Sequence, residues 1–188
     1  MQLPALPKPR LRGRLHQWAF FVSIPAGIAL VALARGAEAR VSAAIFTASL
    51  TALYGVSAAY HRGQWSERVR SRMRRLDHSM IFVLIAGSYT PVTLLALRPA
   101  WGITLLALAW AGAAVGVVIT VLCLERWPVV GFTMYLVLGW LAIVAAPQLA
   151  HSLSRPELAL LAAGGAVLVE DRDDGPRSAS VSCLVEKV

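Results

Sequence analysis

Long apolar runs separated by short polar segments dominate this chain. Five of them reach the length of a membrane span: residues 18–34, 41–60, 79–97, 101–124 and 129–150. A helix needs about 20 mainly apolar residues, and at least about 17, to cross the hydrocarbon core of a bilayer. A sixth run begins at Leu158 but meets a charged segment at Glu170. The pattern predicts five full transmembrane helices and a partial sixth.

The composition supports a membrane protein. Hydrophobic residues make up 57% of the chain, charged residues only 15%, and the mean hydropathy is +0.64. Soluble domains are about 45–50% apolar. The first run could also be read as a cleaved signal peptide, but it is longer than the usual apolar core of about 7–15 residues. We therefore expect an all-α, polytopic helix bundle that retains its first helix, with Pro25 inside it.

The net charge of +8 is concentrated in two places. One precedes the first apolar run (Lys8, Arg10, Arg12 and Arg14), and the other fills the predicted linker between the second and third helices (Arg62, Arg68, Arg70, Arg72, Arg74 and Arg75). This distribution is typical of cytoplasmic segments and favours a lipid bilayer as the partner over nucleic acid. It predicts a multi-pass protein of the cell membrane with a cytoplasmic N-terminus.

Three segments follow from these patterns. Residues 1–17 are expected to form a basic cytoplasmic arm, residues 18–169 the transmembrane bundle, and residues 170–188 a disordered tail. The last 19 residues hold five of the ten acidic residues and show no helical periodicity. The two cysteines, Cys123 and Cys183, form neither a disulfide framework nor a metal motif.

Four polar residues of the second and third runs are candidates for a site. Ser57 and His61 are four residues apart, so a helix places them on one face. Asp77 and Ser88 are eleven apart, about three turns, and share a face too. If the two helices are antiparallel, the linker brings His61 and Asp77 to the same depth. Ionisable groups within membrane spans are rare and usually functional.

A metal centre and a simpler interpretation both fit these residues. Neutral imidazole is the commonest metal ligand, and an aspartate could orient a bound water, whereas taken singly His61 is an interfacial polar residue and Asp77 a charge that balances arginines. A catalytic zinc typically has three protein ligands. His16 lies in the predicted arm, His78 about 100° around the helix from Asp77, and His151 at the opposite membrane face. The ligand set is therefore incomplete.

The same residues carry a resemblance. Three segments closely resemble the hemolysin III family, which is grouped with the progestin and adipoQ receptors and the alkaline ceramidases: Ser57-x-x-x-His61, Arg75-Leu76-Asp77-His78-Ser79, and Ile85-Ala86-Gly87-Ser88-Tyr89-Thr90-Pro91. The likeness extends to residues 23–27 and 138–142 and reaches about Gly165. Beyond it, family-like apolar sequence gives way to a charged mixture. We therefore expect a tail that is truncated or out of frame.

The resemblance implies a seven-helix bundle with a zinc ion near its cytoplasmic face. It implies that His61 is a zinc ligand, that Asp77 holds the zinc-bound water and that Ser57 lies beside the metal. Two further histidines, four residues apart on the seventh helix, would complete the ligands. This sequence has no counterpart for them.

Three functions remain open at this point. The first is a zinc-dependent membrane hydrolase of lipid amides, with Asp77, Ser57 and Ser88 as catalytic residues and His61 as metal ligand. This chain alone is then expected to be inactive unless another polypeptide supplies two histidines. The second is a pore-forming cytolysin, as the family name implies. The third is a receptor-like or structural membrane protein whose arginine-rich linker contacts anionic lipid or a partner.

Overall fold

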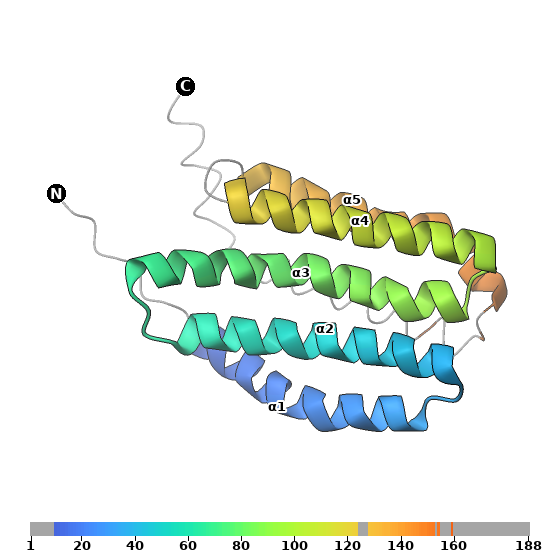
Figure 1. Cartoon of the computed structure of the whole chain (residues 1–188), viewed down its shortest axis with the longest axis horizontal. Coiled ribbons are helices and arrows are strands. Elements are labelled where there is room, and N and C mark those ends of the chain that lie inside the picture. Colours follow the sequence, from blue (N-terminus) through green and yellow to red (C-terminus); the bar gives the residue numbers. More distant parts are fainter. Residues whose placement is uncertain (1–9, 124–127, 153, 155–158, 160–188) are drawn as a thin grey trace. The chain divides into compact units, whose positions relative to one another are not determined.

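The computed structural model describes residues 10–123, 128–152, 154 and 159, and the regular elements in these ranges are all helices. In chain order they are α1 (Arg10–Leu33), α2 (Ala37–Arg62), α3 (Glu67–Leu95), α4 (Pro99–Cys123) and α5 (Pro128–Ser152) (Figure 1). The chain divides into two compact units, residues 1–146 and 147–188. The packing below is that of the first unit.

Within the described ranges, four helices are long and apolar enough to cross a membrane, namely those from α1 to α4. A fifth span is reached only if the bent pair Thr133–Leu141 and Ala145–Ser152, both in α5, is counted as one. The expected all-helical membrane protein is thus confirmed. Its described residues contain four candidate spans where five full spans were expected, or five if the bent pair is counted as one span. The expected partial sixth helix and the tail fall almost wholly outside the described residues.

Two helices begin earlier than the hydropathy pattern indicates. α1 begins at Arg10, not at Trp18, and α3 begins at Glu67, not at Ser79. The expected linker of residues 62–75 is therefore wrong for most of its length, because only residues 63–66 separate α2 from α3. Hydropathy marks the part of a helix that suits lipid. Arginine is itself a good helix former, so both helices continue through basic sequence beyond that part.

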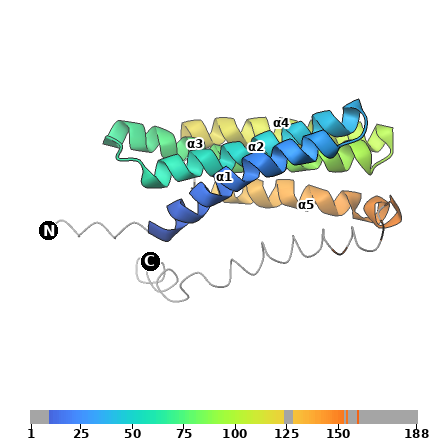
Figure 2. The same cartoon turned by 90° about the horizontal axis from the view of Figure 1, so that it is seen from below.

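The first four helices pack in three consecutive pairs: α1 contacts α2, α2 contacts α3, and α3 contacts α4 (Figures 1 and 2). Small residues permit these approaches. A Cβ placed on Gly27 would lie 2.9 Å from the Cβ of Thr47, and one placed on Gly87 would overlap the side chain of Ser49. Close backbone contact at small residues is the usual packing mode of membrane helices, because lipid leaves little hydrophobic drive for association.

The tightest side-chain core joins α3, α4 and α5. Phe82, Ala86, Ala113 and Leu138 are buried together, with Phe82 completely inaccessible. The ring of Phe82 packs against that of Tyr135, with 4.3 Å between centroids. A hydrogen bond also joins α3 to α5: the hydroxyl of Tyr89 donates to the carbonyl oxygen of Leu138 at 2.8 Å.

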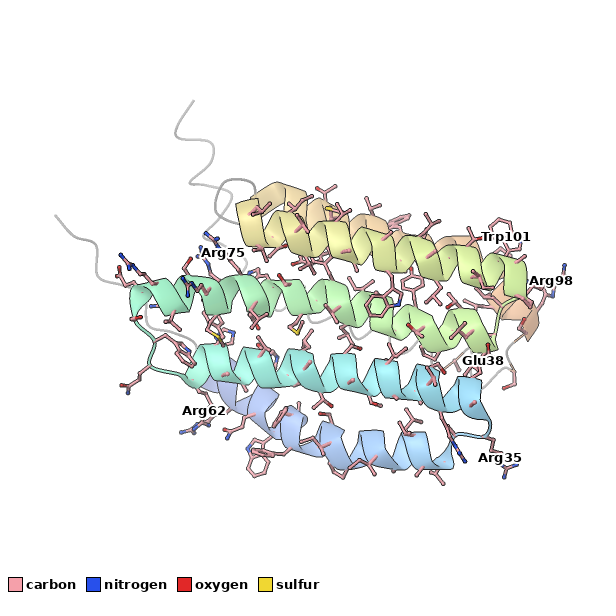
Figure 3. All side chains as sticks on the ribbon, viewed as in Figure 1. Arg35, Glu38, Arg62, Arg75, Arg98 and Trp101 are labelled. Atoms are coloured by element: carbon pink, nitrogen blue, oxygen red, sulfur yellow. The ribbon has the colours of Figure 1, made fainter. Side chains whose placement is uncertain are left out.

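The arginines are unevenly distributed between the two ends of the helices, and most lie at one end. Figure 3 shows Arg62 and Arg75 at the end where α2 stops and α3 starts, and Arg35 and Arg98 at the opposite end. We call the first the arginine-rich end, since Arg68, Arg70, Arg72 and Arg74 also lie in the first turns of α3. Arg75 donates from Nη1 to the carbonyl oxygen of Val121 at 2.8 Å, which ties α3 to the last turn of α4.

Candidate functional site

Ser57 lies on α2 near the arginine-rich end and is buried, with 3% of its surface exposed. Its hydroxyl is 2.7 Å from Nδ1 of His16 on α1. The imidazole of His16 also packs edge-on against Tyr54, one turn before Ser57 on α2, with 5.6 Å between ring centroids. A half-buried histidine and a buried serine thus form a hydrogen-bonded pair between two helices.

His61 occupies the last turn of α2, one residue before the helix ends. It is half-buried, and its ring centroid lies 4.9 Å from that of Tyr60. Across the interface, a Cβ added to Gly13 of α1 would come within 2.9 Å of the Cβ of His61. The backbone of α1 therefore lies directly against the base of the His61 side chain.

Asp77 lies on α3 inside the candidate span Glu67–Leu95, and only 15% of its side-chain surface is exposed. Its Oδ2 is 3.9 Å from Nδ1 of His78, which lies 2.9 Å from the carbonyl oxygen of Arg74. The carbonyl of His78 in turn accepts a hydrogen bond from the hydroxyl of Tyr135 at 3.0 Å. α5 thereby anchors the α3 backbone next to Asp77.

The register of α2 and α3 places the three candidates within about one helical turn of one another along the helix axes. Gly87 of α3 lies opposite Ser49 of α2. At about 1.5 Å per residue, Ser57 and His61 lie roughly 12 and 18 Å beyond Ser49, and Asp77 lies roughly 15 Å beyond Gly87 in the same direction. The level of Asp77 is thus between those of Ser57 and His61, at the arginine-rich end.

Helical geometry also places these side chains on one side of the helix pair. With about 100° per residue, Ser57 and His61 lie roughly 80° and 120° around α2 from Ser49, while Asp77 lies roughly 80° around α3 from Gly87. Because the helices are antiparallel, the two rotations turn toward the same side of the pair. The three residues therefore share a level and a face.

Ser88 shares this face but not this level. It lies eleven residues after Asp77, which corresponds to roughly 16 Å along the helix axis. Its hydroxyl donates to the carbonyl oxygen of Ile85 at 2.8 Å. A small reacting group next to Asp77 would be out of reach of Ser88, whereas an extended molecule could contact both.

The donors do not form a complete metal site. Among the residues that the structure describes, no group of three or more histidine, cysteine, aspartate or glutamate side chains lies close enough together to hold a metal ion. The whole sequence has four histidines, and no two of them are four residues apart. The residues at hand therefore do not fit a zinc ion by themselves.

His16 was not predicted as a site residue, because the basic segment before the first apolar run indicates a polar arm and not a helix. A usable signal was present. His16, Phe20, Ser23 and Gly27 recur at the three- and four-residue spacing of one helical face. In the structure this face contacts α2, where Ser23 bonds Thr51 at 3.0 Å and His16 bonds Ser57.

Comparisons with known proteins identify the family of this chain. The family model described as haemolysin-III related matches residues 5–169. The chain is 36% identical over 153 residues to the Hemolysin-3 homolog of Bacillus subtilis (strain 168), covering 80% of this chain and 71% of that relative. It is likewise 36% identical over 153 residues to Hemolysin-3 of Bacillus cereus, covering 69% of that protein. No solved structure matches the chain. The chain is therefore a multi-pass membrane protein that belongs to the haemolysin-III related family.

Proposed function

We propose that this protein carries part of the site of a membrane hydrolase that cleaves amide bonds in lipids. The observation that supports the proposal is the shared level and face of Ser57, His61 and Asp77 within two candidate spans. A largely buried carboxylate at such a position is costly and is usually kept for function.

Each residue has a role in the proposal. Asp77 orients a water molecule and accepts its proton as the water oxygen attacks the amide carbonyl carbon. The protonated Asp77 then returns this proton to the amide nitrogen as the C–N bond breaks, which releases the fatty acid and the amine. Ser57 donates or accepts a hydrogen bond at the reacting amide. Ser88, roughly 16 Å deeper along α3, contacts the lipid farther from the reacting bond. His61 is the one residue of this set that the resemblance assigns to a metal.

Metal dependence needs ligands that the residues described by the structure do not bring together. The proposal therefore expects two further histidines to come from another polypeptide or from sequence beyond the 188 residues. The arginine-rich end would face the cytoplasm, as the excess of arginines there favours.

The test is a complementation assay in liposomes. The chain is co-expressed with a separate apolar helix that bears two histidines four residues apart, or with the same helix bearing two alanines. Fatty-acid release from ceramide is then measured with zinc or with a chelator. We expect zinc-dependent release only with the histidine helix, and its loss on Asp77→Asn.

The control is Ser49→Ala on α2, a buried serine away from the candidate site whose hydroxyl donates to the Phe46 carbonyl oxygen. A complemented protein that binds zinc and releases no fatty acid from ceramide or a phospholipid would contradict the hydrolase proposal. Release by the chain alone in the presence of chelator would contradict the dependence on added ligands.

The names of the relatives favour a second candidate, a cytolysin. Both matched proteins from Bacillus carry the name hemolysin. This function is tested by dye release from liposomes that contain the purified chain. Dye release that persists in a His61→Ala variant would support a pore, because a pore does not use a metal ligand. No dye release above that of empty liposomes would exclude it.

A further inference from the structure

Buried Ser23 donates to the Phe20 carbonyl of its own helix and also bonds Thr51 across the α1–α2 interface. Ser57 differs from most of the other buried or half-buried serines of these helices. Four of those donate to backbone carbonyl oxygens three or four residues earlier on their own helix, at 2.7–3.1 Å: Ser42, Ser49, Ser79 and Ser88. Such back-bonding is the usual choice of serine within a helix. Ser57 instead bonds across the interface to Nδ1 of His16. Its orientation therefore depends on α1.

The turn of α1 that carries His16 contacts both α2 residues of the candidate site. Gly13, one turn before His16, lies against His61, and a side chain there would collide with the Cβ of that residue. The ring of Tyr54 also packs edge-on against that of His16. This turn of α1 is thus fixed against the same face of α2 at several points.

We propose that His16 is a positioning residue of the site, which holds the hydroxyl of Ser57 in the orientation that the reaction needs. This inference rests on the proposed function for its consequence, since it assigns to α1 a part in that same site. If Nδ1 accepts the hydrogen bond, the lone pairs of Oγ remain available to a substrate donor. If Nδ1 carries the proton, the serine hydroxyl is free to donate to a carbonyl oxygen. In both tautomers the position of Oγ is fixed by His16.

The first test measures whether the two side chains act as a pair. His16→Leu, Ser57→Ala and the double variant are compared in reversible unfolding from detergent micelles. Hydrogen bonds between membrane helices couple by amounts that correspond to about 3- to 20-fold in an equilibrium constant. Each substitution lowers the folding equilibrium constant by some factor. We expect the factor for the double variant to be about 3- to 20-fold smaller than the product of the two single factors. His16→Asn, which keeps a polar atom near the position of Nδ1, should recover part of the coupling. A factor for the double variant equal to the product of the two single factors would show no coupling and would overturn the pairing of His16 with Ser57.

The second test reads the effect of His16 on the chemistry at position 57, which a purely structural bond would not change. Ser57→Cys is made in a chain with Cys123→Ser and Cys183→Ser, and its alkylation by N-ethylmaleimide is timed in membranes at pH 7. An imidazole beside a thiol favours the reactive thiolate. We therefore expect alkylation about fivefold slower after His16→Leu.

Ser49→Cys serves as the matched control, because Ser49 is similarly buried on α2 but contacts α3 rather than His16. Its alkylation should not respond to His16→Leu. Equal rates at position 57 with and without His16 would overturn the proposal. Neither test needs a metal or a substrate. Coupling in a protein that cleaves no lipid even with the two-histidine helix and bound zinc would therefore refute the proposed function and leave the role of His16 in orienting Ser57 standing.

Discussion

The contact between Gly87 and Ser49 sets the spacing of α2 and α3, and with it the geometry of the candidate site. A methyl group added by Gly87→Ala would overlap Oγ of Ser49, lie 2.8 Å from its Cβ, and approach the carbonyl oxygen of Ile45 to 3.6 Å. The Ser49 side chain is too short to move aside, and its hydroxyl bonds the Phe46 carbonyl at 2.7 Å. The helices must therefore separate.

The expected cost combines three contributions. Overpacking a tight interface destabilises by about 1–3 kcal/mol, and disturbing the Ser49 hydrogen bond adds roughly 0.6 kcal/mol. Replacing glycine by alanine within a helix returns about 0.5–1 kcal/mol. We expect Gly87→Ala to lower the free energy of unfolding by about 0.6–3 kcal/mol. Removing the obstacle with Ser49→Gly should restore most of this loss in the double variant.

The assay is reversible unfolding in mixed micelles, followed by tryptophan fluorescence. Gly139→Ala is the control, since nothing lies within 4 Å of a Cβ at that position, and it should be neutral or mildly stabilising. If the double variant is less stable than Gly87→Ala alone, Ser49→Gly does not relieve the overlap. That result would refute the proposed α2–α3 contact.

Three further substitutions test other parts of the structure by the same unfolding assay. Phe82→Ala should destabilise by about 2–4 kcal/mol, since Phe82 is fully buried against the ring of Tyr135, and no loss would contradict the shared core. Tyr135→Phe keeps that ring contact and should cost only about 0.5–1.5 kcal/mol, through the bond to the His78 carbonyl; a loss as large as that of Phe82→Ala would argue against this assignment. Arg75→Met should cost about 0.5–1.5 kcal/mol because the exposed Val121 carbonyl loses its charged donor, whereas an unchanged stability would mean that the bond contributes nothing.

The membrane-embedded parts of the fold were predictable because lipid imposes a simple rule of length and apolarity. The runs at 41–60 and 101–124 differ from α2 and α4 by no more than four residues at either end. The helix starts at Arg10 and Glu67 were not predictable in this way. Their first turns are basic, and hydropathy cannot distinguish a helix that extends into water from a polar loop.

The candidate site was predictable in part. Four-residue spacing correctly places Ser57 and His61 on one face of a helix, since both contact the same turn of α1. Eleven-residue spacing likewise gives Asp77 and Ser88 a common face, but spacing alone ignores the roughly 16 Å between them along the axis. His16 was missed because its role depends on where α1 begins, which the apolar pattern does not reveal.

The central claim is that this chain contributes Ser57, His61 and Asp77 to a metal-dependent site that other ligands must complete. The most direct measurement is the zinc content of the purified protein after co-expression with the two-histidine helix. The account predicts about one zinc ion per chain, lost on His61→Ala and absent with the two-alanine helix. Zinc retained in both controls, or absent in all three samples, would contradict it.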